Sequence, residues 1–321
     1  MAQIRIHRPG PLTTVQDRGR FGFQALGIPT AGAADGFSFR LGNRLLGNPD
    51  GAAALEYWVI GPEVEALDAP VRLALAAGGG TLTRANGDRL ALPAWRTVTL
   101  FPGDRIALGP TVGGAAGYAC FAGGVDVAPV MGSRSTYVRA KLGGFAGRAL
   151  KTGDVLPVGV EVEAAGGERA LSESPVDGEG PFRVVLGPQD DRFDDAGVER
   201  FFTEIYKISP QSDRMGKRLV GPPLTFAPGR GGADIVSDGM VAGAIQVPGS
   251  GEPIIMLADR ATVGGYAKIG AVISADLPRF ARLKPMMEVT FARVSVAEAE
   301  AAAQAFEMRL AELAAAAVAL D

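Results

Sequence analysis

The chain contains very few of the residues from which common catalytic centres are built. Its 321 residues include one histidine, His7, and one cysteine, Cys120. A Ser-His-Asp triad would have to use His7, and a zinc site could draw on one His and one Cys at most. A single cysteine excludes an internal disulfide and is typical of a reducing cytoplasm. We therefore expect no metal site, a solvated His7, and a Cys120 that is buried as a small apolar side chain.

Long apolar segments, excess charge and nucleotide-binding motifs are also missing. No run approaches the ~20 apolar residues of a membrane span, and the N-terminal residues are too polar for a signal peptide. The 32 basic and 35 acidic residues give a net charge of −3, which indicates neither nucleic acid nor an anionic membrane as partner. Gly216-Lys217 is followed by Arg218, so the phosphate-binding loop motif is absent. We expect a cytoplasmic protein without a familiar nucleotide-binding motif.

Short strand signals separated by Gly, Pro and Asp turns dominate the chain from about residue 55 to residue 295. This rhythm favours β-barrels or sandwiches over βαβ units. At about 150 residues per domain, the length suggests two domains. We place an N-terminal barrel region at 1–165, a C-terminal barrel at 180–295 and a terminal helix at 296–321, with 164–181 as linker. An alternative packs residues 1–54 on the second half.

Helix signals are few. Asp35 is a candidate N-cap for a helix to about Leu46, and Asp190 or Asp191 for one through Phe201. Ser274 or Asp276 is a candidate cap for a third helix, through Leu283. The clearest helix begins with the capping box Ser295-x-x-Glu298 and carries one apolar seam. The seam residues are Val296, Ala299, Ala303, Phe306, Leu310 and Leu313. This seam is expected to pack on the chain's own barrel, with a partner as the alternative.

Two short segments occur in both halves of the sequence. Gly61-Pro62 recurs as Gly221-Pro222, and Gly117-Tyr118-Ala119 recurs as Gly265-Tyr266-Ala267. Since Gly-Pro is common in this chain, the recurrence is compatible with a duplication without requiring one.

The most informative stretch is 237–270, where polar residues follow two apolar strands joined by a Pro-Gly-x-Gly turn. Lys268 lies after a Gly-Gly-Tyr-Ala segment, and a lysine near low-dielectric strand ends can act as acid, base or oxyanion stabiliser. Gln246 interrupts an apolar strand with an amide that both donates and accepts, which suits a urea, amide or lactam. The alternatives are a solvated loop lysine and a solvent-facing glutamine.

Three of the chain's Asp-Arg pairs, at 17–18, 213–214 and 259–260, are further candidates for such a site. Neighbours on an extended strand point to opposite faces, so each pair could direct one side chain into a cavity. The alternative is a turn in which Asp accepts from backbone amides. We expect the polar residues of 237–270, together with Arg214, to converge at one barrel rim around a compact ligand.

Seven glycine-rich blocks in fixed order resemble the biotin-dependent carboxyltransferase family, which includes allophanate hydrolase subunit 2, the C subunits of 5-oxoprolinases and KipA-like members. The blocks are Pro9-Gly10 with 13–17 and Gly19-Arg20; Gly32-Ala33 with Asp35; Gly187-Pro188-Gln189; 212–216 with Arg218-Leu219; 243–249; 257–260; and 264–266 with Lys268-Ile269. Together they span nearly all of the chain outside the last helix.

The resemblance implies two cyclophilin-like β-barrel domains and obligate companion proteins. These are a KipI-like protein (the B subunit of 5-oxoprolinase, or allophanate hydrolase subunit 1) and a LamB/YcsF-like protein (the A subunit). Such assemblies form an ATP-dependent 5-oxoprolinase that opens the lactam of 5-oxoproline to glutamate. The resemblance thus implies ATP as a cofactor, bound on a partner or at an interface shared with it. Fused relatives form the carboxyltransferase half of urea carboxylase, but the chain has no biotinylation site, so biotin would require a separate carrier.

The resemblance places a site for an amide or lactam in the second half of the chain. We expect Lys268, Asp259 and Arg260 to be catalytic. We expect substrate to be bound by Arg214, Gln246, Asp213, Gln189, Tyr266 and Thr262. The first hypothesis is a hydrolase subunit for 5-oxoproline that is active only as a hetero-oligomer. The second is a carboxyltransferase or allophanate–urea pathway subunit, and the third a non-catalytic antagonist that binds a KipI-like kinase inhibitor.

Overall fold

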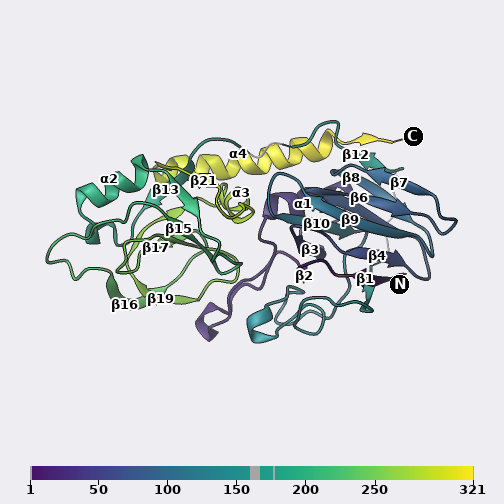
Figure 1. Cartoon of the computed structure of the whole chain (residues 1–321), viewed down its shortest axis with the longest axis horizontal. Helices are drawn as coiled ribbons and strands as arrows, with labels where there is room; N and C mark the ends of the chain where they lie inside the picture. The colour runs from purple at the N-terminus through teal and green to yellow at the C-terminus, as the bar shows by residue number, and fades with distance from the viewer. Residues whose placement is uncertain (1, 160–166, 176–177, 321) are drawn as a thin grey trace. The chain divides into compact units, whose positions relative to one another are not determined.

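The computed structural model describes residues 2–159, 167–175 and 178–320, which form two compact units (Figure 1). Unit 1 consists of Met1–Arg20, Ala31–Val176 and Arg309–Asp321, and unit 2 of Phe21–Thr30 and Asp177–Met308. Of the first 54 residues, only Phe21–Thr30 cluster with unit 2. The expected linker at 164–181 lies partly outside the described residues, and its described part contains the short strand β12 (Arg169–Ala170).

Two antiparallel sheets share the core of unit 1. Their orders are β11-β1-β4-β9-β6-β7 and β2-β3-β10-β5-β8-β12-β23. The strands besides β12 are β1 (Ala2–Arg8), β2 (Thr13–Gln16), β3 (Ala54–Trp58), β4 (Glu63–Ala66), β5 (Val71–Ala76), β6 (Gly78–Thr83), β7 (Arg89–Leu92), β8 (Arg96–Leu100), β9 (Arg105–Thr111), β10 (Ala116–Phe121), β11 (Val155–Val158) and β23 (Val318–Ala319). Ile4 of β1 in the first sheet and Leu55 of β3 in the second belong to one buried hydrophobic cluster. Apolar residues that alternate along β1 thus meet those of the other sheet.

Helix α1 (Gly36–Leu45) explains why β5 and β10 are buried along their whole length. It packs on both strands, so each has the core on one face and the helix on the other. A Cβ at Gly42 would lie 2.8 Å from Cys120 Sγ, so the missing side chain permits this close approach. The Asp35 carboxylate accepts from the backbone N–H groups of Phe37 and Ser38, as expected for the N-cap. Cys120 is free and buried, which confirms the prediction.

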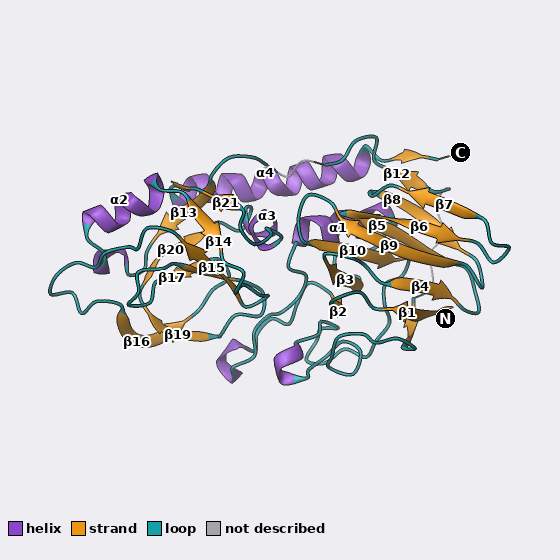
Figure 2. Cartoon of the chain, viewed as in Figure 1, coloured by secondary structure: helices purple, strands orange, loops and turns teal. Residues whose placement is uncertain are grey.

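Unit 2 is built on an eight-stranded mixed sheet of order β21-β14-β15-β18-β17-β20-β13-β22. Figure 2 shows the strands of this unit in orange. Its strands are β13 (Phe182–Leu186), β14 (Tyr206–Ile208), β15 (Gly216–Val220), β17 (Ala244–Gln246), β18 (Ile254–Met256), β20 (Lys268–Val272), β21 (Glu288–Val289) and β22 (Phe291–Arg293). The two edge strands, β21 and β22, are separated by Thr290 alone, which brings the edges together into a nearly closed barrel. A separate ribbon pairs β16 (Asp234–Gly239) with β19 (Val263–Tyr266).

The helices of unit 2 differ in part from the prediction. Asp190 and Asp191 begin only the single turn η3 (Asp190–Arg192), and α2 (Asp195–Thr203) is capped by Asp194. The prediction that Asp190 or Asp191 begins this helix was wrong because the cap lies a few residues further along. Helix α3 (Leu277–Ala281) follows Asp276, whose carboxylate binds Arg183 instead of capping the helix. Single turns also occur at η1 (Gln24–Leu26) and, in unit 1, at η2 (Val138–Ala140).

The last helix, α4 (Val296–Ala315), begins as predicted. The Ser295 backbone N–H donates to Glu298 Oε2 (2.7 Å), and the Glu298 N–H donates to Ser295 Oγ (3.2 Å). Most of the seam is less exposed than the rest of the helix, with Leu310 fully buried, but Val296 is exposed. The first turns of α4 line a cavity of about 230 Å³ together with β13 and β20. None of the described helices is long and apolar enough to span a membrane. The prediction of a mainly β, barrel-like fold with few short helices and a C-terminal helix is confirmed.

Candidate functional site

Lys268 is the first residue of β20 and is almost fully buried, with 4% of its surface exposed. Its ammonium group forms an ion pair with the carboxylate of Asp238, which lies on the β16–β19 ribbon. The other carboxylate oxygen of Asp238 accepts a hydrogen bond from Gln189 Nε2 (3.0 Å). A buried cation, an anion and an amide thus form one hydrogen-bonded group.

Two glutamines complete this group. The Lys268 backbone N–H donates to Gln189 Oε1 (3.1 Å), and the Gln189 N–H donates to the Lys268 carbonyl (3.1 Å). Gln246 pairs with Lys268 across the β17–β20 ladder. A Cβ at Gly264 would lie 3.2 Å from Gln246 Oε1, so glycine lets the ribbon approach. We call Gln189, Asp238, Gln246 and Lys268 the lysine cluster.

Arg214 and Asp259 form a second polar group. The guanidinium donates from Nε (2.9 Å) and Nη2 (3.0 Å) to the two oxygens of Asp259. Both side chains are about 10% exposed. The Asp259 N–H also donates to the Arg214 carbonyl (2.9 Å), so backbone and side chains fix the same pair of loops. Bidentate pairing of this kind is geometrically specific. It directs two donors of the Arg214 guanidinium toward a side chain of the protein itself.

Arg260 is buried beside this pair and binds mainly backbone. Its Nε donates to the Met240 carbonyl (3.0 Å), and its Nη1 donates to Thr30 Oγ1 (3.1 Å). Gln24 Nε2 donates to the same Met240 carbonyl (3.0 Å). Burial lowers the pKa of the Arg260 guanidinium. Arg260 therefore ties the Phe21–Thr30 segment to the end of the ribbon within unit 2.

The structure does not gather all predicted residues at one rim. Gly216 of β15, two residues after Arg214, pairs with Met256, the last residue of β18. Gln246 and its neighbour Lys268 instead lie level with Ile254, the first residue of β18. The Arg214–Asp259 pair and the lysine cluster thus lie at opposite ends of β18. Spacing along the chain does not specify strand direction and register, so the sequence analysis does not separate these two groups.

The other predicted residues are more exposed. The Asp213 carboxylate accepts from the Met215 backbone N–H (2.7 Å), as expected for a turn residue. Thr262 is half-buried, and its carbonyl accepts from the Met240 N–H (2.9 Å). Tyr266 is 39% exposed at the end of β19, two residues before Lys268. Of these three, Tyr266 is nearest in the chain to the lysine cluster.

Two residues of interest were missed by the sequence analysis. Asp238 lies within the stretch 237–270, but nothing in the sequence indicates which cation it meets. Lys217 was considered only for a phosphate-binding motif. It is buried in unit 2, its Nζ donates to the Leu283 carbonyl (2.8 Å), and burial lowers its pKa to about 8. In β15, Lys217 is buried and Arg218 is exposed because neighbouring residues of a strand point to opposite faces of the barrel. The sequence alone does not show which of the two residues points inward.

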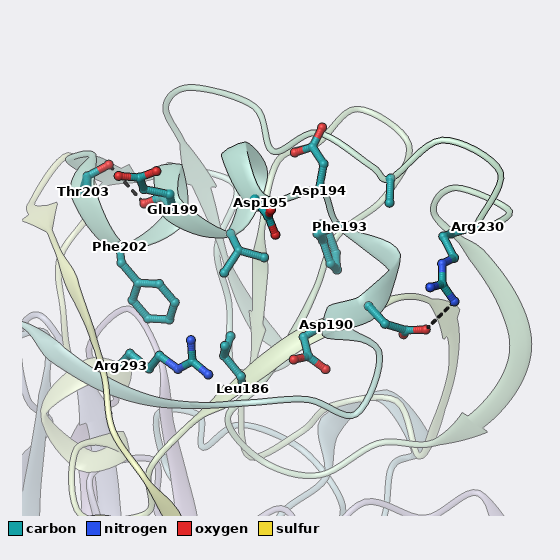
Figure 3. Close-up of a pocket in the computed structure, with 13 residues that line it drawn as sticks. Leu186, Asp190, Phe193, Asp194, Asp195, Glu199, Phe202, Thr203, Arg230 and Arg293 are labelled. Atoms are coloured by element: carbon teal, nitrogen blue, oxygen red, sulfur yellow. Dashed lines mark hydrogen bonds and ion pairs between the residues drawn. The ribbon is translucent and has the colours of Figure 1, made fainter.

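A separate cavity of about 830 Å³ opens in unit 2 (Figure 3). Its apolar lining includes Leu186, Phe193 and Phe202. Its charged lining is predominantly acidic and comprises Asp190, Asp191, Asp194, Asp195, Glu199, Arg230 and Arg293. None of the predicted site residues lines it. In the part of the chain that the structure describes, no group of three or more His, Cys, Asp or Glu side chains is arranged to hold a metal ion.

Comparison with known proteins identifies relatives over most of the chain. The family described as "Carboxyltransferase domain, subdomain A and B" matches residues 26–293. The C subunit of the 5-oxoprolinase of Escherichia coli (strain K12) is 36% identical over 305 residues, which cover 94% of both chains. The urea amidolyase of Lachancea kluyveri is 32% identical over 91% of this chain but only 17% of its own length.

A solved structure agrees with these matches. The crystal structure of the K. lactis urea amidolyase superposes with a TM-score of 0.85 at 28% identity, over 97% of this chain and 20% of that protein. The chain therefore spans about a fifth or less of the urea amidolyases, and nearly the whole of the bacterial relative.

Proposed function

The chain belongs to the carboxyltransferase domain family (subdomains A and B), and from this premise we propose that it is a subunit of an ATP-dependent 5-oxoprolinase. The reaction would open the lactam of 5-oxoproline to glutamate. The observation that carries the proposal is the match to the C subunit of a 5-oxoprolinase along nearly the whole of both chains. A bacterial subunit that aligns along 94% of both chains offers a closer functional parallel than a segment of a much longer enzyme.

The lysine cluster has the chemistry that this reaction requires. Opening a lactam places negative charge on the carbonyl oxygen, and a fixed cation in a nearly dry site stabilises such charge strongly. Lys268 supplies that cation, and the amides of Gln189 and Gln246 can orient the lactam N–H and C=O. We assign Lys268 the electrostatic role at the carbonyl. Arg214, Asp259 and Arg260 are engaged internally, so we assign them to holding the loops of the barrel.

ATP fits poorly in the large acidic cavity of unit 2. Five carboxylates against two arginines line it, and such a surface repels a triphosphate. We therefore propose that ATP binds on a companion protein or at a shared surface. The companions in this proposal are a KipI-like B subunit and a LamB/YcsF-like A subunit. A single, free and buried Cys120 fits a reducing compartment, so a cytoplasmic location is part of the same proposal.

The alternative function is a carboxyltransferase of the urea–allophanate pathway. It is supported by the family description and by the structural similarity to urea amidolyase. In this case a separate biotinylated carrier would deliver the carboxyl group, and the same amide-orienting residues would hold urea.

Reconstitution tests the proposal directly. The purified chain is combined with the KipI-like and LamB/YcsF-like companions, ATP and 5-oxoproline, and glutamate release is measured; urea with a carboxybiotinylated carrier is assayed in parallel. Lys268→Ala should lower glutamate release about 100-fold or more, because it removes the charge that stabilises the carbonyl oxygen. Lys207→Ala, the same change at an exposed lysine of unit 2, should leave the rate unchanged.

Two outcomes contradict the proposal. Carboxylation of urea without glutamate release would favour the alternative function. Full activity of Lys268→Ala, with a normal thermal unfolding curve, would remove this residue from the site.

A further inference from the structure

Lys268 depends on a carboxylate that belongs to a different sheet. The side chain of Lys268 is 5% exposed, whereas that of its partner Asp238 is 40% exposed. Burying an ammonium group is costly unless an anion or several acceptors replace water. Asp238 provides that anion, and its remaining surface stays open to solvent. The ion pair therefore lies at the edge of the buried region, where Asp238 keeps it in contact with solvent.

The contacts of Gln189 close a ring around this ion pair. Gln189 Nε2 donates to the Asp238 carboxylate (3.0 Å), and Gln189 Oε1 accepts from the Lys268 backbone N–H (3.1 Å). The amide therefore fixes the rotation of the carboxylate relative to the start of β20. A lysine side chain has four flexible carbon–carbon bonds, so its ammonium is located only as well as its partners are. Here the partners are tied to the backbone that carries the lysine.

The ribbon brings Asp238 to this position. Asp238 pairs with Gly264 in the β16–β19 ladder, and β19 continues through Ala267 into Lys268. A Cβ at Gly264 would collide with Met240 Cε and would lie 3.2 Å from Gln246 Oε1. The missing side chain at Gly264 therefore lets the ribbon lie against the lysine cluster. A side chain there would require Met240 and the Gln246 amide to move.

We propose that Asp238 is a positioning residue, which holds the Lys268 ammonium at the place where the carbonyl oxygen of the substrate accumulates negative charge. The expected effect on kcat rests on the proposed function, but the effect of Asp238 on the position of Lys268 does not. Asp238 does not touch the reacting atoms in this proposal. It acts through Lys268, and Gln189 supports it.

The kinetic test compares two aspartates of the same strand in the reconstituted complex. Asp238→Asn should lower kcat about 10- to 100-fold, because a displacement of about 1 Å at a charged group is enough to cost that much. KM should change by less than about threefold, since the substrate-orienting amides remain. Asp238→Glu should recover part of the loss because it restores the anion. Asp234→Asn, an exposed carboxylate on the same ribbon, should leave both constants unchanged.

A second readout uses the isolated full-length chain and needs no activity. An amine-directed acylating reagent is applied, and modification of each lysine is followed by mass spectrometry. Lys268 should react far more slowly than exposed Lys207 in the wild type, and several-fold faster in Asp238→Asn than in Asp234→Asn. If Asp238→Asn fails to fold, Gln189→Ala replaces it, with a smaller change expected in the same direction.

The two readouts separate failure of the inference from failure of the proposed function. If the wild-type complex releases no glutamate but Asp238→Asn still frees Lys268 for labelling, the positioning role stands and the assigned reaction is wrong. Unchanged labelling of Lys268 in a folded Asp238→Asn chain overturns the inference. A wild-type kcat in Asp238→Asn overturns it equally.

Discussion

The two units use the same Gly-Tyr-Ala segment in opposite ways. In unit 1, Tyr118 is fully buried, donates to Glu56 (2.7 Å) and accepts from the Asp35 N–H (2.9 Å). In unit 2, Tyr266 is exposed and leads directly to Lys268. One segment closes a core and the other borders the candidate site. A recurring sequence motif therefore says little about role until its surroundings are known.

The polar networks of the two units also differ in how far their members are exposed to solvent. Buried Glu56 accepts from the Tyr118 hydroxyl, the Ala34 N–H (2.8 Å) and the Trp58 Nε1–H (3.0 Å). Its donors belong to the same unit, and a sealed network of this kind serves stability. The lysine cluster keeps one partner, Asp238, open to solvent. A ligand can therefore reach the lysine cluster from solvent, whereas the Tyr118 hydroxyl of the other network is fully buried.

Breaking the sealed network should have the largest effect on stability. Glu56→Ala leaves three donors without this acceptor, among them the fully buried Tyr118 hydroxyl, and the free energy of unfolding should fall by about 4 kcal/mol. Glu63→Ala, at a half-buried strand position of the same unit, is the control and should cost under about 1 kcal/mol. Urea denaturation followed by circular dichroism measures both. A loss below 1 kcal/mol for Glu56→Ala would contradict the idea that the network is structural.

The next largest effect concerns buried lysines, which occur only in unit 2. Of the lysines, all of which lie in the described part of the chain, Lys217 and Lys268 alone are buried. The pKa of Lys217 is lowered from 10.5 to about 8 by burial. Between these two values the unfolded chain binds more protons, so stability should rise with pH across this window, by roughly 3 kcal/mol from this group. Below about pH 8, the destabilisation caused by burying Lys217 should not change with pH.

Lys217→Met isolates this contribution, because every other titrating group is shared with the wild type. The difference in unfolding free energy between the two proteins should shrink as pH rises from 8 to 10.5. If that difference instead stays constant over this pH range, burial of a charged Lys217 does not destabilise the folded protein.

The smallest predicted effect tests a feature that the units have in common. Tyr57 and Tyr206 are buried, and within the described residues their hydroxyl groups have no hydrogen-bond partner. Each ring packs on the glycine of a Gly-Pro pair, where a Cβ would lie 3.1 Å from Tyr57 at Gly61 and 2.6 Å from Tyr206 at Gly221. Burial raises the pKa of both, that of Tyr206 to about 12.

Removing either hydroxyl should therefore raise stability by about 1 kcal/mol, since an unpaired buried hydroxyl is unfavourable. Tyr57→Phe and Tyr206→Phe are compared by thermal unfolding with Tyr118→Phe, which loses a hydrogen bond to Glu56 and should be destabilising. Loss of stability in both of the first two variants would indicate that water pairs these hydroxyls.

Local features of the fold could be predicted from the sequence, and non-local ones could not. Asp35 and the Ser295–Glu298 box were identified because capping involves residues within one turn of each other. The start of α2 was misplaced because several adjacent aspartates compete for the same role. The barrel-like strand rhythm was evident, whereas the order in which strands pair was not.

The same limit applies to the candidate site. Lys268, Gln246 and Gln189 were recognised as unusual polar residues, and the structure brings all three together. Arg214 was grouped with them but lies at the other end of β18, since register decides which strand ends meet. Asp238 was missed because its partner is set by the bulged pairing of the ribbon, which no spacing rule supplies.

The closure of the unit 2 barrel at β21 and β22 has a consequence for folding during synthesis. β22 (Phe291–Arg293) pairs with β13, which begins at Phe182, so strands more than 100 residues apart must meet before the barrel is complete. During synthesis, unit 2 therefore cannot acquire its final hydrogen bonds until the chain has emerged past Arg293. A nascent polypeptide interrupted before that point would expose an unpaired strand edge, the kind of surface that aggregates.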